Sequence, residues 1–173
     1  MKTENQKRVL ITGANRGIGL GFAQECLSRG DLVFAGCRDT AHARDLQSLK
    51  ATYPENCIIV ELDVTDQCSI GASFEFIQTQ AGGLDLLVNN AAYTTNLFES
   101  INDFQPEIML RHFQVNAFAP MAVIQRYLRL LRKGQNAKIA TISSEAGSFR
   151  SNAKAKSFRG YSYPASKAAL NMM

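Results

Sequence analysis

The sequence lacks several patterns that define common classes of protein. Its four cysteines form no C-x-x-C pair and its two histidines lie far apart, so no metal site is expected. No apolar run reaches the ~18 residues that a membrane helix needs, and the opening MKTENQKR has no apolar core of a signal peptide. These absences predict a cytoplasmic protein with reduced thiols and no membrane partner.

The sequence has no strong excess of positive or negative charge. Charged residues make up 20% of the chain, and the net charge is only +4. The one local basic cluster comprises Arg150, Lys154, Lys156 and Arg159. Charge runs of this kind usually form a solvated surface. A nucleic-acid partner is not expected, because no aromatic-rich basic face accompanies the cluster.

The 173 residues suffice for one domain, and the 46% hydrophobic residues suffice for a core. Short apolar runs alternate with segments of helical period, which predicts βαβ units, a parallel sheet and helices on both faces. We therefore expect a doubly wound α/β fold over residues 1–173. The predicted strands are Val9–Thr12, Leu32–Cys37, Cys57–Leu62, Leu84–Asn89 and Ala137–Ser143, and the predicted helices are Ile18–Leu27, Ala41–Tyr53, Ile70–Ile77, Ile108–Leu131 and one beginning near Ser162.

A glycine-rich turn, Thr12-Gly-Ala-Asn-Arg-Gly-Ile-Gly19, separates the first predicted strand from the first predicted helix. It is neither the G-x-G-x-x-G fingerprint nor a P-loop, since no G-K-[S/T] follows. A helix N-terminus presents unpaired N–H groups to an anion, and glycines allow a pyrophosphate to approach the backbone. The turn predicts a dinucleotide site.

The same turn resembles the T-G-x-x-x-G-x-G motif of classical short-chain dehydrogenases/reductases, and the resemblance extends over the chain. The other matching segments are Leu62-Asp-Val64, Asn89-Asn-Ala-Ala92, Asn116, Ser143-Ser-Glu-Ala-Gly147 and Tyr163-Pro-Ala-Ser-Lys167. The chain is most similar to the carbonyl reductase, sniffer and C-factor group. The resemblance implies a three-layer αβα Rossmann fold, hydride transfer and a single NAD(P)-binding domain.

The resemblance also implies roles for particular residues. Tyr163 would be the acid/base, Lys167 its partner, Ser144 the donor to the substrate oxygen and Asn116 the holder of a water; Ser143 is the weaker choice of serine. The implied cofactor-binding residues are Gly13, Asn15, Arg16, Gly17, Ile18, Gly19, Arg38, Asp63, Val64, Asn90, Tyr163 and Lys167.

The spacing of Tyr163 and Lys167 supports this chemistry. Residues at i and i+4 share one helical face, and a nearby cation favours the ionised form of a phenol. Tyr161 lacks such a partner, because Ala165 stands four residues after it. Asn116 has a structural alternative, in which it stabilises a helix irregularity near Pro120.

The end of the second predicted strand, Gly36-Cys-Arg38, indicates which nicotinamide cofactor is preferred. Cys37 stands where a carboxylate would bind a free ribose 2′-hydroxyl. Arg38 and Arg16 supply guanidinium groups that suit a 2′-phosphate. We therefore predict NADP(H) in preference to NAD(H), with Asp39 as a cap for the following helix.

Three departures from the family pattern stand out. Ala92 replaces the usual glycine, and should be tolerated if its φ is negative. The stretch Ser148–Arg159 lengthens the interval between the serine and the tyrosine, as a substrate lid or as a surface loop. The chain ends two turns after Lys167, whereas family members continue, so the fold is expected to be C-terminally incomplete.

The sequence thus favours an NADP(H)-dependent oxidoreductase that acts on a small carbonyl or alcohol substrate, with the full-length protein a homodimer or homotetramer. The alternative is a non-catalytic nucleotide-binding or signalling protein on the same fold. A fold analogy does not name the substrate.

Overall fold

The computed structural model describes residues 6–95, 99–154 and 160–173. These residues form two compact units, one within 1–91 and 123–141 and the other within 92–122 and 142–173. The chain passes twice from the first unit to the second. The single domain over residues 1–173 stays a prediction.

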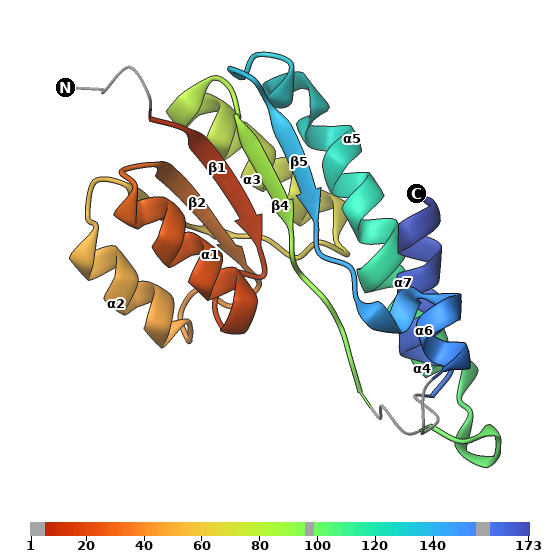
Figure 1. Cartoon of the computed structure of the whole chain (residues 1–173). Coiled ribbons are helices and arrows are strands. Elements are labelled where there is room, and N and C mark those ends of the chain that lie inside the picture. The colour runs from red at the N-terminus through yellow and green to blue at the C-terminus, as the bar shows by residue number, and fades with distance from the viewer. Residues whose placement is uncertain (1–5, 96–98, 155–159) are drawn as a thin grey trace. The chain divides into compact units, whose positions relative to one another are not determined.

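The first unit is built on a five-stranded parallel sheet in the order β3-β2-β1-β4-β5. Its strands are β1 (Arg8–Thr12), β2 (Leu32–Cys37), β3 (Cys57–Glu61), β4 (Leu86–Asn89) and β5 (Lys138–Thr141). Strand order reverses between β1 and β4, which is the point where α/β sheets bind ligands. The predicted doubly wound Rossmann topology is therefore confirmed (Figure 1).

Helices cover both faces of this sheet. Figure 1 shows α1 and α2 on one face and α3 on the opposite face. The bounds are α1 (Gly17–Ser28), α2 (Arg44–Thr52), α3 (Gln67–Ala81) and α5 (Ala119–Leu131), whose residues from 123 onward belong to this unit. Tyr127 of α5 is fully buried and donates a hydrogen bond of 2.8 Å to the Ser73 hydroxyl of α3.

The core lies where apolar residues of adjacent strands pair. Leu10 of β1 pairs with Phe34 of β2 and Leu87 of β4, and all three are fully buried. Burial on both faces explains the continuous apolar runs in the sequence.

Several predicted element boundaries move inward, and hydrogen bonds account for two of these changes, at the starts of β4 and α2. Strand β4 begins at Leu86 instead of Leu84, because the Leu84 N–H donates to the Leu130 carbonyl of α5. Helix α2 begins at Arg44 instead of Ala41, because Asp39 accepts a hydrogen bond from the His42 N–H and closes a turn before the helix. Asp39 thus caps that turn, while Ala43 stands at the helix N-cap position.

The second unit contains α4 (Pro106–Phe113), α6 (Phe149–Ala153), α7 (Ser162–Met172) and the short 3₁₀ segments η1 (Ile101–Asp103) and η3 (Glu145–Gly147). A π-helical segment, η2 (Gln114–Phe118), joins α4 to α5, so the single helix predicted over Ile108–Leu131 is interrupted. Pro120 has no N–H to donate to the Asn116 carbonyl. The Ala119 N–H instead reaches back to the Gln114 carbonyl, five residues earlier.

The polar stretch after η3 contains helix α6 where the sequence predicts only a loop. The Ser148 hydroxyl accepts a hydrogen bond from the Ser151 N–H and caps α6. Residues 155–159, which include Lys156 and Arg159 of the basic cluster, lie outside the described residues.

Within the described ranges, no helix is both long enough and apolar enough to span a bilayer. The same ranges hold no group of three or more His, Cys, Asp or Glu side chains that could bind a metal ion. The four cysteines are free thiols.

Candidate functional site

The glycine turn after β1 is packed tightly against the end of β4. Gly13 has φ +64°, and a Cβ at this position would lie 2.9 Å from the Ala91 Cα. A Cβ on Gly19 would overlap the Gly13 carbonyl and the Asn90 amide. These two glycines are thus required by the protein's own backbone.

Gly17 differs, because its φ is +56° and no atom lies within 4 Å of a Cβ built there. It is exposed and opens α1, behind an N-cap residue, Arg16, in extended conformation. No side chain caps this helix and no acidic residue stands in its first turn. The N–H groups of the first turn therefore suit an anionic ligand such as a pyrophosphate.

Thr12, which the sequence analysis did not single out, ties the glycine turn to β4. Its hydroxyl oxygen accepts hydrogen bonds of 3.0 Å from the N–H groups of Asn90 and Ala91. The Asn90 amide donates to the Thr12 and Gly13 carbonyls, at 2.9 and 3.0 Å. Asn90, predicted to bind cofactor, therefore also shapes the turn.

The side chains that would select the cofactor lie at the carboxyl ends of β1 and β2. Arg16 and Arg38 are exposed, and neither pairs with a carboxylate among the described residues. Cys37 is buried, and the Asp39 carboxylate lies 2.7 Å from the His42 Nδ1. At the end of β2, the position predicted to face the ribose is therefore Cys37 instead of a carboxylate, and the Arg38 guanidinium follows it.

The segment predicted to contact adenine follows β3. The Asp63 carboxylate accepts hydrogen bonds from the N–H and the hydroxyl of Thr65, at 2.8 and 2.7 Å, and Val64 is buried. These contacts fix the turn before α3, whose own N-cap is Asp66.

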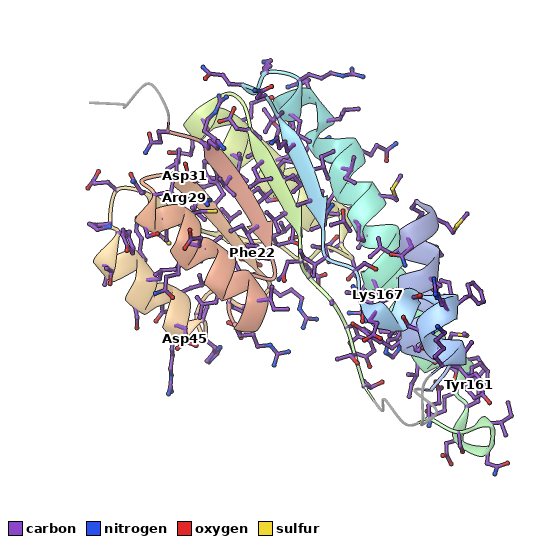
Figure 2. All side chains as sticks on the ribbon, in the orientation of Figure 1. Phe22, Arg29, Asp31, Asp45, Tyr161 and Lys167 are labelled. Atoms are coloured by element: carbon purple, nitrogen blue, oxygen red, sulfur yellow. The ribbon has the colours of Figure 1, made fainter. Side chains whose placement is uncertain are left out.

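In the second unit, Tyr163 and Lys167 lie one turn apart on α7, as their spacing predicts. The Lys167 side chain is 3% exposed, and its Nζ lies 5.9 Å from the centre of the Tyr163 ring (Figure 2 labels Lys167). Nζ donates a hydrogen bond of 2.7 Å to the Ile142 carbonyl and meets no carboxylate within 4 Å among the described residues. Burial lowers the pKa of this ammonium.

The two candidate serines differ in how their hydroxyls are used. Ser143 donates its hydroxyl to the Asn171 side-chain oxygen, at 2.5 Å. The Ser144 hydroxyl oxygen instead accepts a bond from the Ala146 N–H, at 3.1 Å, which leaves its proton to donate. The geometry therefore favours Ser144 as the donor to a substrate.

Segment η3, which follows Ser144, packs directly on α7. A Cβ at Gly147 would lie 2.8 Å from the carbonyl carbon and oxygen of Lys167. The absence of a side chain at Gly147 thus lets the serine segment approach the helix that carries Tyr163.

Asn116 is fully buried in the π-helical segment. Its side-chain oxygen accepts from the Tyr93 N–H at 2.7 Å, and its amide donates to the Tyr93 carbonyl and the Ser166 hydroxyl. Ser166 donates in turn to the Tyr163 carbonyl. The irregularity near Pro120 that the sequence analysis considered is therefore present.

The backbone at Ala92 does not require a glycine. Its φ is not positive, because Asn136 is the one described non-glycine residue with positive φ.

Sequence reasoning missed two buried side chains beside α7, Glu99 and His112. Glu99 accepts hydrogen bonds from the first turn of that helix. The His112 ring lies edge-on to the rings of Tyr93 and Tyr163, with centres 4.9 and 6.2 Å away. No local pattern marks either residue, because the contacts of Glu99 with Ser162 and of His112 with Tyr163 join segments that are distant in sequence.

The doubly wound sheet, and the uncapped first turn of α1 that suits an anion, place the fold in the class of nucleotide-binding α/β proteins. Comparison with family models narrows this class: the model described as short chain dehydrogenase matches residues 7–173. The chain therefore belongs to the short-chain dehydrogenase family.

Individual relatives agree with this assignment. An uncharacterized oxidoreductase of Schizosaccharomyces pombe is 34% identical over 172 residues, which cover 99% of this chain and 66% of the relative. The NADPH-bound carbonyl reductase from chicken fatty liver is 38% identical with a TM-score of 0.87, over 96% of this chain and 71% of that one. The carbonyl reductase Sniffer of D. melanogaster is 29% identical, also with a TM-score of 0.87, over 97% and 72%. The chain thus spans about two thirds of the length of the S. pombe relative.

Proposed function

We propose that the protein is an NADP(H)-dependent oxidoreductase that transfers a hydride between nicotinamide and a carbonyl or alcohol, with Tyr163 as the acid/base. The observation that carries this proposal is the buried Lys167 ammonium beside the Tyr163 ring, without a carboxylate within 4 Å among the described residues. A buried charge without a counterion is costly. A phenolate at Tyr163 would supply the missing negative charge.

Each of the candidate residues in the second unit would then have its own role in proton transfer. In carbonyl reduction, Tyr163 donates its phenolic proton to the substrate oxygen, and Lys167 stabilises the phenolate that remains. Ser144 donates its hydroxyl proton in a hydrogen bond to the same oxygen and orients it. Asn116 holds a water that connects Lys167 to solvent, in addition to fixing Tyr93 and Ser166.

The first unit would hold the cofactor, which supplies or accepts the hydride when bound. The first turn of α1 would bind the pyrophosphate, and the guanidinium groups of Arg16 and Arg38 the 2′-phosphate. The NADPH bound to the similar carbonyl reductase from chicken fatty liver supports this preference. The full set of proposed cofactor residues is Gly13, Asn15, Arg16, Gly17, Ile18, Gly19, Arg38, Asp63, Val64, Asn90, Tyr163 and Lys167.

The substrate would be a small carbonyl or alcohol, and the whole protein a cytoplasmic homodimer or homotetramer. The similarity to two carbonyl reductases supports the substrate class. The family's acid/base chemistry supports the alternation of Tyr163 between phenol and phenolate.

The test is NADPH oxidation with a panel of aldehydes, quinones and ketones. The Tyr163→Phe variant should lose about 100-fold or more in kcat, which is the lower end of the range for general acid catalysis. Tyr161→Phe is the matched control, because it removes a hydroxyl two residues away, and should stay within about twofold of the wild type. A wild type that binds NADPH but reduces none of the panel would instead favour a non-catalytic nucleotide-binding protein.

A further inference from the structure

The N-cap residue of helix α7 does not cap the helix with its own side chain. Tyr161 stands at the N-cap position with φ −104° and ψ −51°, and its side chain makes no capping hydrogen bond. The first N–H groups of a helix have no partner within the helix, so another acceptor is required. The acceptor here comes from a residue 63 positions earlier in the sequence.

Glu99 supplies that acceptor with both carboxylate oxygens. Its Oε2 accepts from the Ser162 N–H at 2.9 Å and from the Tyr161 N–H at 3.2 Å. Its Oε1 accepts from the Ser162 hydroxyl at 3.0 Å. The three bonds join the segment before η1 to the start of α7, where Figure 2 labels Tyr161.

The Glu99 carboxylate is 4% exposed, and within the described ranges it forms no ion pair with a Lys or Arg. Burial opposes its ionisation. The N–H and hydroxyl of Ser162 and the N–H of Tyr161, with a smaller contribution from the nearby His112, outweigh this and lower its pKa. A carboxylate at a helix N-terminus also interacts favourably with the helix dipole. Glu99 is therefore an ionised side chain bound to the first turn of α7.

The contacts of Glu99 lie next to the reactive residue. Tyr163 directly follows Ser162, and its ring faces the buried His112 ring. Further along the helix, Ser166 is held by Asn116. Helix α7 is thus fixed at its start by Glu99 and at its middle by Asn116, with Tyr163 between the two attachments.

We propose that Glu99 is a positioning residue for Tyr163, which acts by holding the first turn of α7 in the orientation that proton transfer needs. Its catalytic consequence rests on the proposed function. A displacement of about 1 Å at a reacting group can cost about 100-fold in rate, so loss of this anchor should lower kcat more than it raises KM.

The test compares Glu99→Ala, Glu99→Gln and a matched control, Asp66→Ala. Asp66 caps α3 by accepting from the Cys68 N–H at 2.9 Å. Glu99→Ala should lower kcat about tenfold or more with KM for NADPH and for the carbonyl within about threefold. Glu99→Gln keeps an oxygen acceptor for the two N–H groups and should restore kcat to within about threefold. Asp66→Ala should lower the unfolding midpoint while kcat stays within about twofold.

Amide hydrogen exchange supplies a readout that does not depend on turnover. Exchange at Tyr161 and Ser162 should accelerate at least about tenfold in Glu99→Ala and remain near wild type in Asp66→Ala. Unchanged exchange in α7, or a kcat loss that Asp66→Ala reproduces at equal loss of stability, overturns the proposal. If the wild type reduces no carbonyl, the proposed function fails, and the exchange comparison alone decides whether Glu99 holds α7.

Discussion

At the scale of single residues, Asp85 is a buried carboxylate that accepts hydrogen bonds from Arg8 and Gln135. Arg8 donates to it from Nε at 2.9 Å and from Nη2 at 2.7 Å, and the N–H groups of Arg8 and Gln135 donate as well. Burial opposes ionisation of the carboxyl, but these donors outweigh it and lower its pKa from 3.8 to about 2.

The stability contributed by Asp85 should therefore depend on pH. Because the pKa is lowered in the fold, the contribution is complete above about pH 4 and is lost as the pH falls through about 2. Its size should be about 1–2 kcal/mol, since Arg8 is 23% exposed and solvent screens the pair. Urea unfolding of the wild type and Asp85→Asn at pH 5 and pH 2 measures this, and a stability difference that does not shrink toward pH 2 would contradict it.

Arg38 is the residue expected to choose the cofactor. Replacing Arg38 by Asp puts a carboxylate beside the ribose position and removes the donor to a 2′-phosphate. The ratio of kcat/KM for NADPH over NADH should fall by about tenfold to 100-fold, the range for loss of a charge-assisted hydrogen bond. The exposed Arg44→Asp change is the control for net charge. A ratio that moves equally in both variants would point to long-range charge instead of a direct contact.

At the scale of elements, one buried tyrosine joins α5 to α3. Tyr127 donates to Ser73, its ring lies edge-on to Phe74, and burial raises its pKa to about 12. Tyr127→Phe should cost about 0.5–1.5 kcal/mol of unfolding free energy, the net value of one hydrogen bond. Ser73 keeps its bond to the Ile70 carbonyl, so no larger penalty is expected.

Chemical denaturation of Tyr127→Phe beside the exposed Tyr161→Phe measures this cost. The exposed variant should lie within about 0.5 kcal/mol of the wild type. Equal stability of the wild type and Tyr127→Phe would show that the α3–α5 contact depends on ring packing alone.

At the scale of the whole molecule, a ligand that binds only the folded protein raises its stability. NADPH at 100 times its dissociation constant should add about 2.7 kcal/mol to the free energy of unfolding. NADH at the same concentration should add less, since Arg16 and Arg38 would gain no 2′-phosphate. Thermal unfolding with each nucleotide measures the difference. Equal shifts would remove the predicted preference, and no shift with either would remove the cofactor assignment.

Much of the fold was open to prediction because it depends on neighbours in sequence. The apolar run Leu32–Cys37 is β2 with the predicted bounds, and the turn from Thr12 to Gly19 joins β1 to α1 as expected. Tyr163 and Lys167 share α7 because a spacing of four residues returns to the same helical face. The π-helical interruption was foreseen only as an irregularity near Pro120.

By itself, the sequence determined the order of strands and helices along the chain and the family to which the chain belongs. It also determined that Tyr163 and Lys167 share one helical face. These follow from periodicity and motifs that act over a few residues. Only the tertiary structure decided that Gly13 and Gly19 face the end of β4 and that Glu99 caps α7. It also decided that the Ser143 hydroxyl donates to Asn171, whereas the Ser144 hydroxyl donates no hydrogen bond among the described residues. The Glu99 contact spans 63 residues, and no local pattern reports a hydrogen bond that forms only when distant segments pack together.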